Sequence, residues 1–78
     1  MKTVKISLNS IDKVKSFVIE NTKYDYDFDL VSGRYVIDAK SIMGIFSLDL
    51  SKSIDLNIHA DDNEIDKILE TLKPYIVE

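Results

Sequence analysis

Cysteine is absent from the chain, which excludes disulfide bonds and metal centres built on thiolates. That absence suits a reducing compartment. No apolar run approaches the roughly 20 residues that a membrane-spanning helix needs, and the first residues lack the apolar core of a secretory signal peptide. The sequence therefore predicts a cytoplasmic protein that has no membrane segment.

An excess of basic residues is also missing. The 10 lysines and arginines are outnumbered by 14 acidic residues, so the formal net charge is −4. A general nucleic-acid binder needs a basic face to neutralise phosphates, and we therefore expect no nucleic-acid partner. The acidic residues are spread along the chain, as at positions 25–29 and 61–64, and indicate a solvated surface.

Histidine occurs only once, at position 59, and this scarcity limits the available chemistry. His59 cannot form a metal site with its flanking residues, because Asp61 and Asp62 are better explained by helix capping. No nucleophile–base pair, glycine-rich phosphate loop or metal-spaced cluster appears elsewhere in the sequence. The sequence therefore predicts a protein that is not an enzyme and that uses no metal or cofactor.

The length and the overall composition are those of a small folded domain. The 78 residues are enough for one domain, which we expect to span residues 1–78. At this size folding buries only about 60% of the unfolded surface, so every element must use its apolar face. A hydrophobic content of 45% with 31% charged residues fits a globular domain and not a disordered tail.

Four segments alternate apolar and polar residues with the period of a half-buried strand. They are predicted at residues 2–8, 24–30, 34–38 and 54–59. The turn residues Ser32 and Gly33 are expected to join the second and third segments into an antiparallel hairpin. Across this turn, Arg34 is expected to lie near Asp29.

Three segments repeat apolar residues at helical spacing. One runs from residue 11 to about residue 21, and a short one follows Ser41. The last follows a predicted capping box, in which Asp61 caps and Glu64 reaches back. Proline lacks an amide hydrogen, so this helix should kink or fray near Pro74. The predicted apolar faces of the first and last helices are Ile11, Val14, Phe17 and Val18, and Ile65, Ile68, Leu69, Leu72 and Ile76.

The predicted order of elements is strand, helix, strand, strand, helix, strand, helix (βαββαβα). Each strand is apolar on one face only, so the sheet is expected to be antiparallel, with helices covering a single side. The predicted fold class is therefore α+β. It is an open-faced β-sandwich, in which three helices cover one face of a four-stranded antiparallel sheet.

The most specific stretch of the sequence is residues 39–48, which read AKSIMGIFSL. Ser41 is predicted to be an N-cap, because its hydroxyl precedes a short helical run and can accept a bond from a first-turn amide. This stretch resembles the regulatory-serine segment of the histidine-containing phosphocarrier (HPr) family of the bacterial sugar phosphotransferase system, and residues 40–44 all match. The resemblance implies the same open-faced β-sandwich that the order of elements predicts independently.

The family's other signature is missing from the chain. In the family, a histidine at the amino end of the first helix carries phosphate, and a nearby arginine interacts with the phosphoryl charge. Matching the first helix through residues 16–18 places Ser10 at the histidine position, Asp12 at the arginine position and Lys13 at the proline position. Serine can cap the helix but cannot form a labile phosphohistidine, and Asp12 would repel a phosphate.

Ser41 matches a residue that some family members modify. In low-GC Gram-positive bacteria the matching serine is phosphorylated by a dedicated kinase, and the product binds a transcription regulator. The resemblance therefore makes Ser41 the candidate phosphorylation site and Lys40, Ile42, Met43 and Phe46 the candidate partner-binding residues. In the alternative interpretation Ser41 only caps the helix, while Ile42, Met43 and Phe46 pack into the fold.

These observations support one leading hypothesis and leave two alternatives open. The leading hypothesis is a non-catalytic HPr-like regulatory or protein-binding module that acts through the Ser41 segment. Its candidate partners are an HPr kinase, a transcription regulator or components of the phosphotransferase system, and we expect a monomer. One alternative is a phosphocarrier that uses another residue, for which His59 is the one candidate. The other is a scaffold or assembly module that keeps only the fold.

Overall fold

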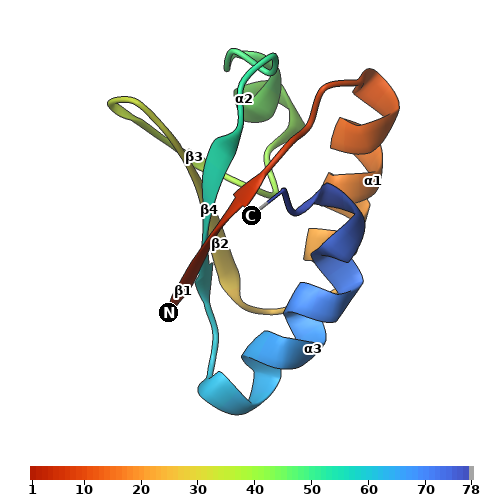
Figure 1. The fold of residues 1–78 in the computed structure, drawn as a ribbon, viewed down its shortest axis with the longest axis vertical. Helices are drawn as coiled ribbons and strands as arrows, with labels where there is room; N and C mark the ends of the chain where they lie inside the picture. Colours follow the sequence, from red (N-terminus) through yellow and green to blue (C-terminus); the bar gives the residue numbers. More distant parts are fainter. Residues whose placement is uncertain (78) are drawn as a thin grey trace.

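The computed structural model describes residues 1–77, and every predicted helix and strand is present in it (Figure 1). The strands are β1 (Lys2–Ile6), β2 (Asp27–Ser32), β3 (Tyr35–Asp38) and β4 (Ile54–His59). The helices are α1 (Ile11–Thr22), α2 (Ile42–Phe46) and α3 (Asp62–Leu72), and a short 3-10 helix, η1 (Lys73–Tyr75), follows.

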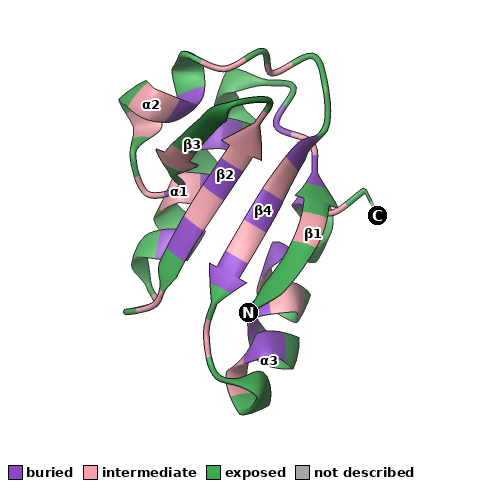
Figure 2. Ribbon diagram, turned by 90° about the vertical axis from the view of Figure 1, so that its left-hand side faces the viewer, coloured by how far each residue is buried: buried purple, intermediate pink, exposed green. Residues whose placement is uncertain are grey.

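The strands form one antiparallel sheet in the order β1-β4-β2-β3, and the helices lie on one side of it. Figure 2 views the open face of this sheet, with the helices behind. The central strands β4 and β2 are more buried than the edge strands β1 and β3. The predicted α+β open-faced β-sandwich is therefore confirmed.

The core lies between the sheet and the helices, as the alternation of apolar residues requires. Every second residue of β4 is buried, and so are Phe28 and Leu30 of β2, while the residues between them face the open side. Burying one such side chain contributes roughly 1.5–3 kcal/mol relative to leaving it exposed. The main contributors are Phe28 and Leu30 in β2, Ile54, Leu56 and Ile58 in β4, Val14 and Phe17 in α1, and Ile65, Ile68 and Leu72 in α3.

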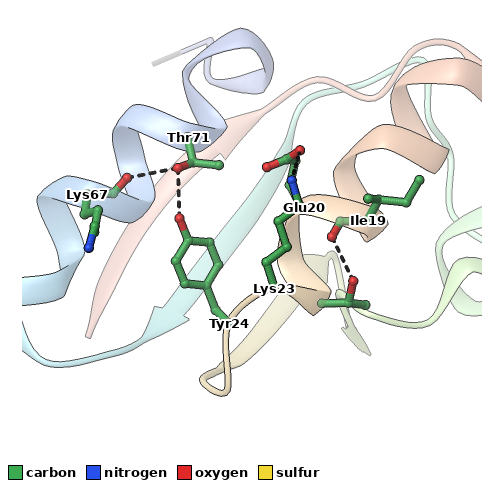
Figure 3. A network of polar contacts seen from close by, with 7 residues as sticks. Ile19, Glu20, Lys23, Tyr24, Lys67 and Thr71 are labelled. Carbon is green, nitrogen blue, oxygen red and sulfur yellow. Dashed lines mark hydrogen bonds and ion pairs between the residues drawn. The ribbon is translucent and has the colours of Figure 1, made fainter.

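The prediction that the second strand begins at residue 24 is wrong, because β2 begins at Asp27. After α1, the amides of Lys23 and Tyr24 still donate to the carbonyls of Glu20 and Asn21, at 3.3 and 3.2 Å, so the backbone there is not extended. Instead, the Tyr24 hydroxyl reaches α3 (Figure 3). Alternation alone does not form a strand where no neighbouring strand is available for pairing.

The β2–β3 hairpin is present, but its turn does not bring Arg34 to Asp29. The two-residue turn is Gly33-Arg34, and Gly33 has a φ of 60°, a value that favours glycine. The register pairs Asp29 with Asp38, so Arg34 lies at the far end of the hairpin. The predicted proximity of Arg34 and Asp29 is therefore wrong.

The predicted capping box at the start of α3 is also wrong. Asp61 occupies the N-cap position, but its side chain makes no capping hydrogen bond. Its backbone carbonyl accepts bonds from the amides of Glu64 and Ile65, at 2.8 and 3.1 Å. Asp61 is exposed, so its carboxylate is solvated, and the negative charges of Asp62 and Glu64 favour the helix start through the dipole.

The end of α3 agrees with the prediction for Pro74, whereas Ile76 differs from it. The α-helix stops at Leu72 and continues as η1, which contains Pro74. Ile76 is not helical and forms an isolated bridge with Ile6 of β1. The proline ends the α-helix, so the residues that follow are free to pair with the sheet edge.

Candidate functional site

Ser41 caps α2 as the sequence predicts. Its backbone is extended, with φ −100° and ψ 102°, and its Oγ accepts a hydrogen bond from the Gly44 amide at 3.2 Å. The Ser41 carbonyl accepts the first helical bond, from Ile45, at 3.0 Å. The side chain is exposed, so its hydroxyl is accessible.

The segment before Ser41 is held by the end of β3. The Ser41 amide donates to the Asp38 carbonyl at 3.0 Å, and the Lys40 amide donates to the Asp38 carboxylate at 2.9 Å. Asp38 therefore accepts bonds through its main chain and through its side chain. These two bonds close the turn that leads from the sheet into α2.

Lys40 is half-buried, and its ammonium group contacts other residues of the chain. Its Nζ donates to the Tyr24 carbonyl at 2.8 Å and lies 5.6 Å from the centroid of the Phe28 ring. Cations interact favourably with aromatic faces at such distances. The geometry gives Lys40 a structural role, and a role in partner binding stays a prediction that these contacts do not support.

The helix α2 exposes two of the apolar residues that were predicted to bind a partner. Met43 is 78% exposed and Phe46 is 41% exposed, whereas Ile45 is fully buried. Ile42 is half-buried and packs against the core. Of the alternative interpretation, the packing of Ile42 is confirmed and the packing of Met43 and Phe46 is wrong, because Gly44 and Ile45 face the sheet.

The start of α1 carries a second serine cap. The Ser10 Oγ accepts a hydrogen bond from the Lys13 amide at 3.2 Å, as predicted, and Ser10, Asp12 and Lys13 are all exposed. Ile11 was predicted on the apolar face, but it is 61% exposed. It occupies the first helical position, where the side chain lies beyond the edge of the core.

A groove of about 500 Å³ connects the start of α1 with the end of α2. Its lining residues are Asn9, Ser10, Ile11, Phe46, Leu50 and Ser51. Ser10 and Phe46, which belong to different sequence segments, are therefore brought to one surface. The exposure of Ile11 and the place of the half-buried Leu50 in this groove were not predicted, although the position of Ile11 directly after a cap indicated exposure.

Asp49 lies beside this groove in the loop that follows α2. Its carboxylate accepts bonds from the Ser51 hydroxyl and the Ser51 amide, at 2.6 and 3.1 Å. These two bonds, the hydroxyl first, lower the pKa of Asp49 below its ordinary value, and the charge of Lys52 contributes in the same direction. Lys52 Nζ lies 4.0 Å from the same carboxylate, so the negative charge of Asp49 is balanced within the loop.

His59 lies on the open face of the sheet, as predicted, and its neighbours are acidic. Its Nε2 lies 2.7 Å from the Asp29 carboxylate, and Asp27 is its partner in the register between β2 and β4. Asp38 lies opposite Asp29 on β3.

Within residues 1–77, no group of three or more potential ligands has a geometry that suits a metal ion. No helix in the same range is long and apolar enough to cross a membrane.

A family model for HPr proteins, described as the PTS HPr component phosphorylation site, matches residues 13–78. The chain belongs to the HPr family. This membership relates it to the phosphotransferase system, whose HPr component is a phosphocarrier and not a catalytic enzyme in the usual sense. The matched range contains Ser41 and all of α2, and it begins after Ser10 and Asp12.

Solved HPr structures resemble the chain over most of its length. HPr-C-His from Thermoanaerobacter tengcongensis is 30% identical, with a TM-score of 0.73 over 92% of this chain and 90% of that chain. The phosphocarrier protein HPr from Bacillus anthracis is 27% identical, with a TM-score of 0.69 over 96% and 93%. The mycoplasma histidine-containing phosphocarrier protein, 14% identical with a TM-score of 0.69 over 94% and 86%, is similar in fold. No curated protein sequence matches the chain.

Proposed function

We propose that this HPr-family chain is a non-catalytic regulatory protein that binds a protein partner through Ser41 and the apolar surface of α2. The observation that carries the proposal is the exposure of the Ser41 hydroxyl beside Met43 and Phe46. A methionine and an aromatic ring exposed on one short helix are suited to docking, since methionine adapts to varied partners.

Phosphorylation of Ser41 would change the charge of this surface without disturbing the core. A kinase would form a bond between Ser41 Oγ and the γ-phosphorus of ATP, break the bond between that phosphorus and the β,γ-bridging oxygen, and release the hydroxyl proton. The product carries about 1.5–2 negative charges. The Lys40 ammonium is bonded to the Tyr24 carbonyl, so the partner would have to supply the opposing cation.

The start of α1 supports a role without phosphate transfer. Ser10 occupies the place that the family resemblance assigns to the carrier histidine, and its hydroxyl serves as a cap. Asp12 lies in the first turn of α1, where its negative charge would oppose a phosphoryl group. The groove between Ile11 and Phe46 can instead receive an apolar side chain of the partner.

The test is to incubate the chain with an HPr kinase and ATP and to locate phosphate by mass spectrometry. We expect one phosphate, which Ser41→Ala abolishes. Ser47→Ala is the matched control, because Ser47 is also exposed beside α2. Met43→Ala should weaken partner binding about tenfold with unchanged stability, because its side chain is exposed. An unmodified Ser41, with no partner retained by immobilised Ser41→Asp protein, would contradict the proposal.

The two alternatives receive less support from the geometry. The Asp29 carboxylate contacts His59, and Asp27 and Asp38 line the same depression, so these acidic groups would repel an incoming phosphoryl group. Acid-labile phosphate after incubation with phosphoenolpyruvate and the system's first enzyme would favour that alternative. A scaffold that keeps only the fold would self-associate, and light scattering over a dilution series distinguishes it from a monomer.

A further inference from the structure

We propose that Asn21, near the end of α1, is a positioning residue for Ser41. Its side chain is fully buried, and its Nδ2 donates to the Ala39 carbonyl at 3.3 Å. Ala39 is also fully buried, and it lies two residues before Ser41. Asn21 therefore links α1 directly to the segment that leads into the α2 cap. Its consequence for phosphorylation rests on the proposed function, whereas its structural part stands separately.

Core packing alone does not explain an asparagine at this position. Asn21 lies on the buried side of α1, together with Val14 and Phe17. Its Oδ1 is buried without a hydrogen-bond partner among the described residues, which costs free energy. A leucine would fill similar space and would not bury an unpaired oxygen. What the asparagine supplies, and leucine cannot, is a donor for the Ala39 carbonyl.

The contacts of Ala39 show how Asn21 can influence the position of Ser41. The Ala39 amide donates to the Phe28 carbonyl at 2.8 Å, and its carbonyl accepts from Asn21. Both backbone polar groups of this buried residue are therefore engaged. Without Asn21, the carbonyl would be buried and unpaired, and the following peptide would rotate to reach water. That peptide leads through Lys40 into Ser41, so its rotation would shift the cap.

Lys40, the residue after Ala39, is also held by the loop that follows α1. Lys40 donates to the carbonyl of Tyr24, which follows α1 closely. Tyr24 is fixed in turn, since its hydroxyl lies 2.8 Å from Thr71 Oγ1, which donates to the Lys67 carbonyl at 3.2 Å (Figure 3). The end of α1 and the loop after it therefore hold two successive residues before Ser41, and α3 supports that loop.

Hydrogen exchange in Asn21→Leu tests the positioning role without any kinase. We expect the Ser41 and Gly44 amides to exchange about five- to tenfold faster than in the unmodified chain, the factor for one lost hydrogen bond. The amide of Leu56, in the central strand, should change only with global stability. Ile68→Val, a conservative change in the α3 core, is the matched control and should not change the ratio of Ser41 to Leu56 exchange.

A measurement on the unmodified chain covers the case in which Asn21→Leu fails to fold. The Asn21 side-chain amide should exchange at least tenfold more slowly than that of Asn9, which is exposed. Equal exchange of these two side chains would overturn the proposal. Unchanged Ser41 and Gly44 exchange in a folded Asn21→Leu variant would also overturn it.

The kinase assay separates this inference from the proposed function. In Asn21→Leu, kcat/KM for Ser41 phosphorylation should fall about fivefold, mainly through KM, because the misplaced cap docks less well. Faster exchange at Ser41 in a chain that the kinase never modifies would support positioning and contradict the proposed function. If the kinase modifies Ser41 but Asn21→Leu changes neither the exchange of Ser41 nor kcat/KM, the proposed function is supported and the positioning role is contradicted.

Discussion

At the scale of single residues, Ser10 and Ser41 make the same bond in different surroundings. Each Oγ accepts an amide hydrogen at 3.2 Å from the residue three positions on. The first turn of α1 contains Asp12, whereas the first turn of α2 contains no acidic residue. A phosphate on Ser10 would face a carboxylate within its own helical turn, and one on Ser41 would not. Both serines cap a helix, and the acidic residue in the first turn of α1, absent from that of α2, distinguishes the two helix starts.

The hydrogen bonds of Asp49 predict how the stability of the fold depends on pH. The pKa of Asp49 is lowered by the Ser51 hydroxyl, so its ionised form favours the folded state. That contribution is present above the ordinary value of 3.8 and is lost as the pH falls through the lower folded pKa. In urea titrations, Asp49→Asn should therefore be less stable than the unmodified chain at pH 6, and the difference should shrink as the pH falls below 3.8. Ser51→Ala should reproduce most of the difference, and a gap that persists at low pH would contradict this account.

At the scale of elements, α2 is oriented by the close approach of Gly44 to β3. A Cβ atom on Gly44 would lie 2.6 Å from Ile37 Cγ2 and 3.2 Å from Ser41 Oγ. With only hydrogen at this position, the helix can lie against the strand and direct Met43 away from it. The resulting orientation exposes the apolar surface on which the proposed function depends.

Gly44→Ala should therefore destabilise the chain, although alanine normally favours a helix over glycine by about 1 kcal/mol. We expect a loss of about 1–3 kcal/mol in the free energy of unfolding, because the added methyl group overlaps Ile37. Urea denaturation measures it. Ile37→Leu removes the Cγ2 atom, so the double variant should recover part of the loss. If the losses of the two single variants simply add in the double variant, the overlap is not the cause.

At the scale of the whole molecule, residues 75–77 connect the helical layer to the edge of the sheet through hydrogen bonds. The Ser7 amide donates to the Tyr75 carbonyl at 2.9 Å, and the Val77 amide donates to the Lys5 carbonyl at 2.9 Å. The Tyr75 ring packs edge-on against Phe17 of α1, with centroids 5.5 Å apart. Strand β1 is therefore covered along part of its outer edge, which limits pairing with another chain.

Removing the Tyr75 ring should weaken the whole fold. Tyr75 is 8% exposed, so Tyr75→Ala is expected to cost about 3–5 kcal/mol in the free energy of unfolding, measured by urea denaturation. Tyr75→Phe keeps the ring and is the control. It should cost less than about 1 kcal/mol, because the change keeps the packed ring and removes one hydroxyl. Equal losses in the two variants would mean that the ring packing is not the source of the stability.

The order of elements and the single buried face of the sheet followed from periodicity, because apolar spacing dictates which residues can share a core. Both serine caps and the end of α3 before Pro74 were also predictable from local chemistry. The start of β2 was not, because strand pairing with β4, and not alternation, decides where extended backbone is stable. The role of Asn21 was missed, although a polar residue four positions after Phe17 on the apolar face was a visible signal.

The sequence by itself therefore determined the fold class and the chemistry of the Ser41 cap, since both depend on residues close together in the chain. Only the tertiary structure decided which side chains are presented around that cap. It directed Lys40 inward to the Tyr24 carbonyl and left Met43 and Phe46 in solvent. The physical reason is that exposure depends on how α2 packs against β3 and α1, and these contacts join segments that local periodicity cannot relate.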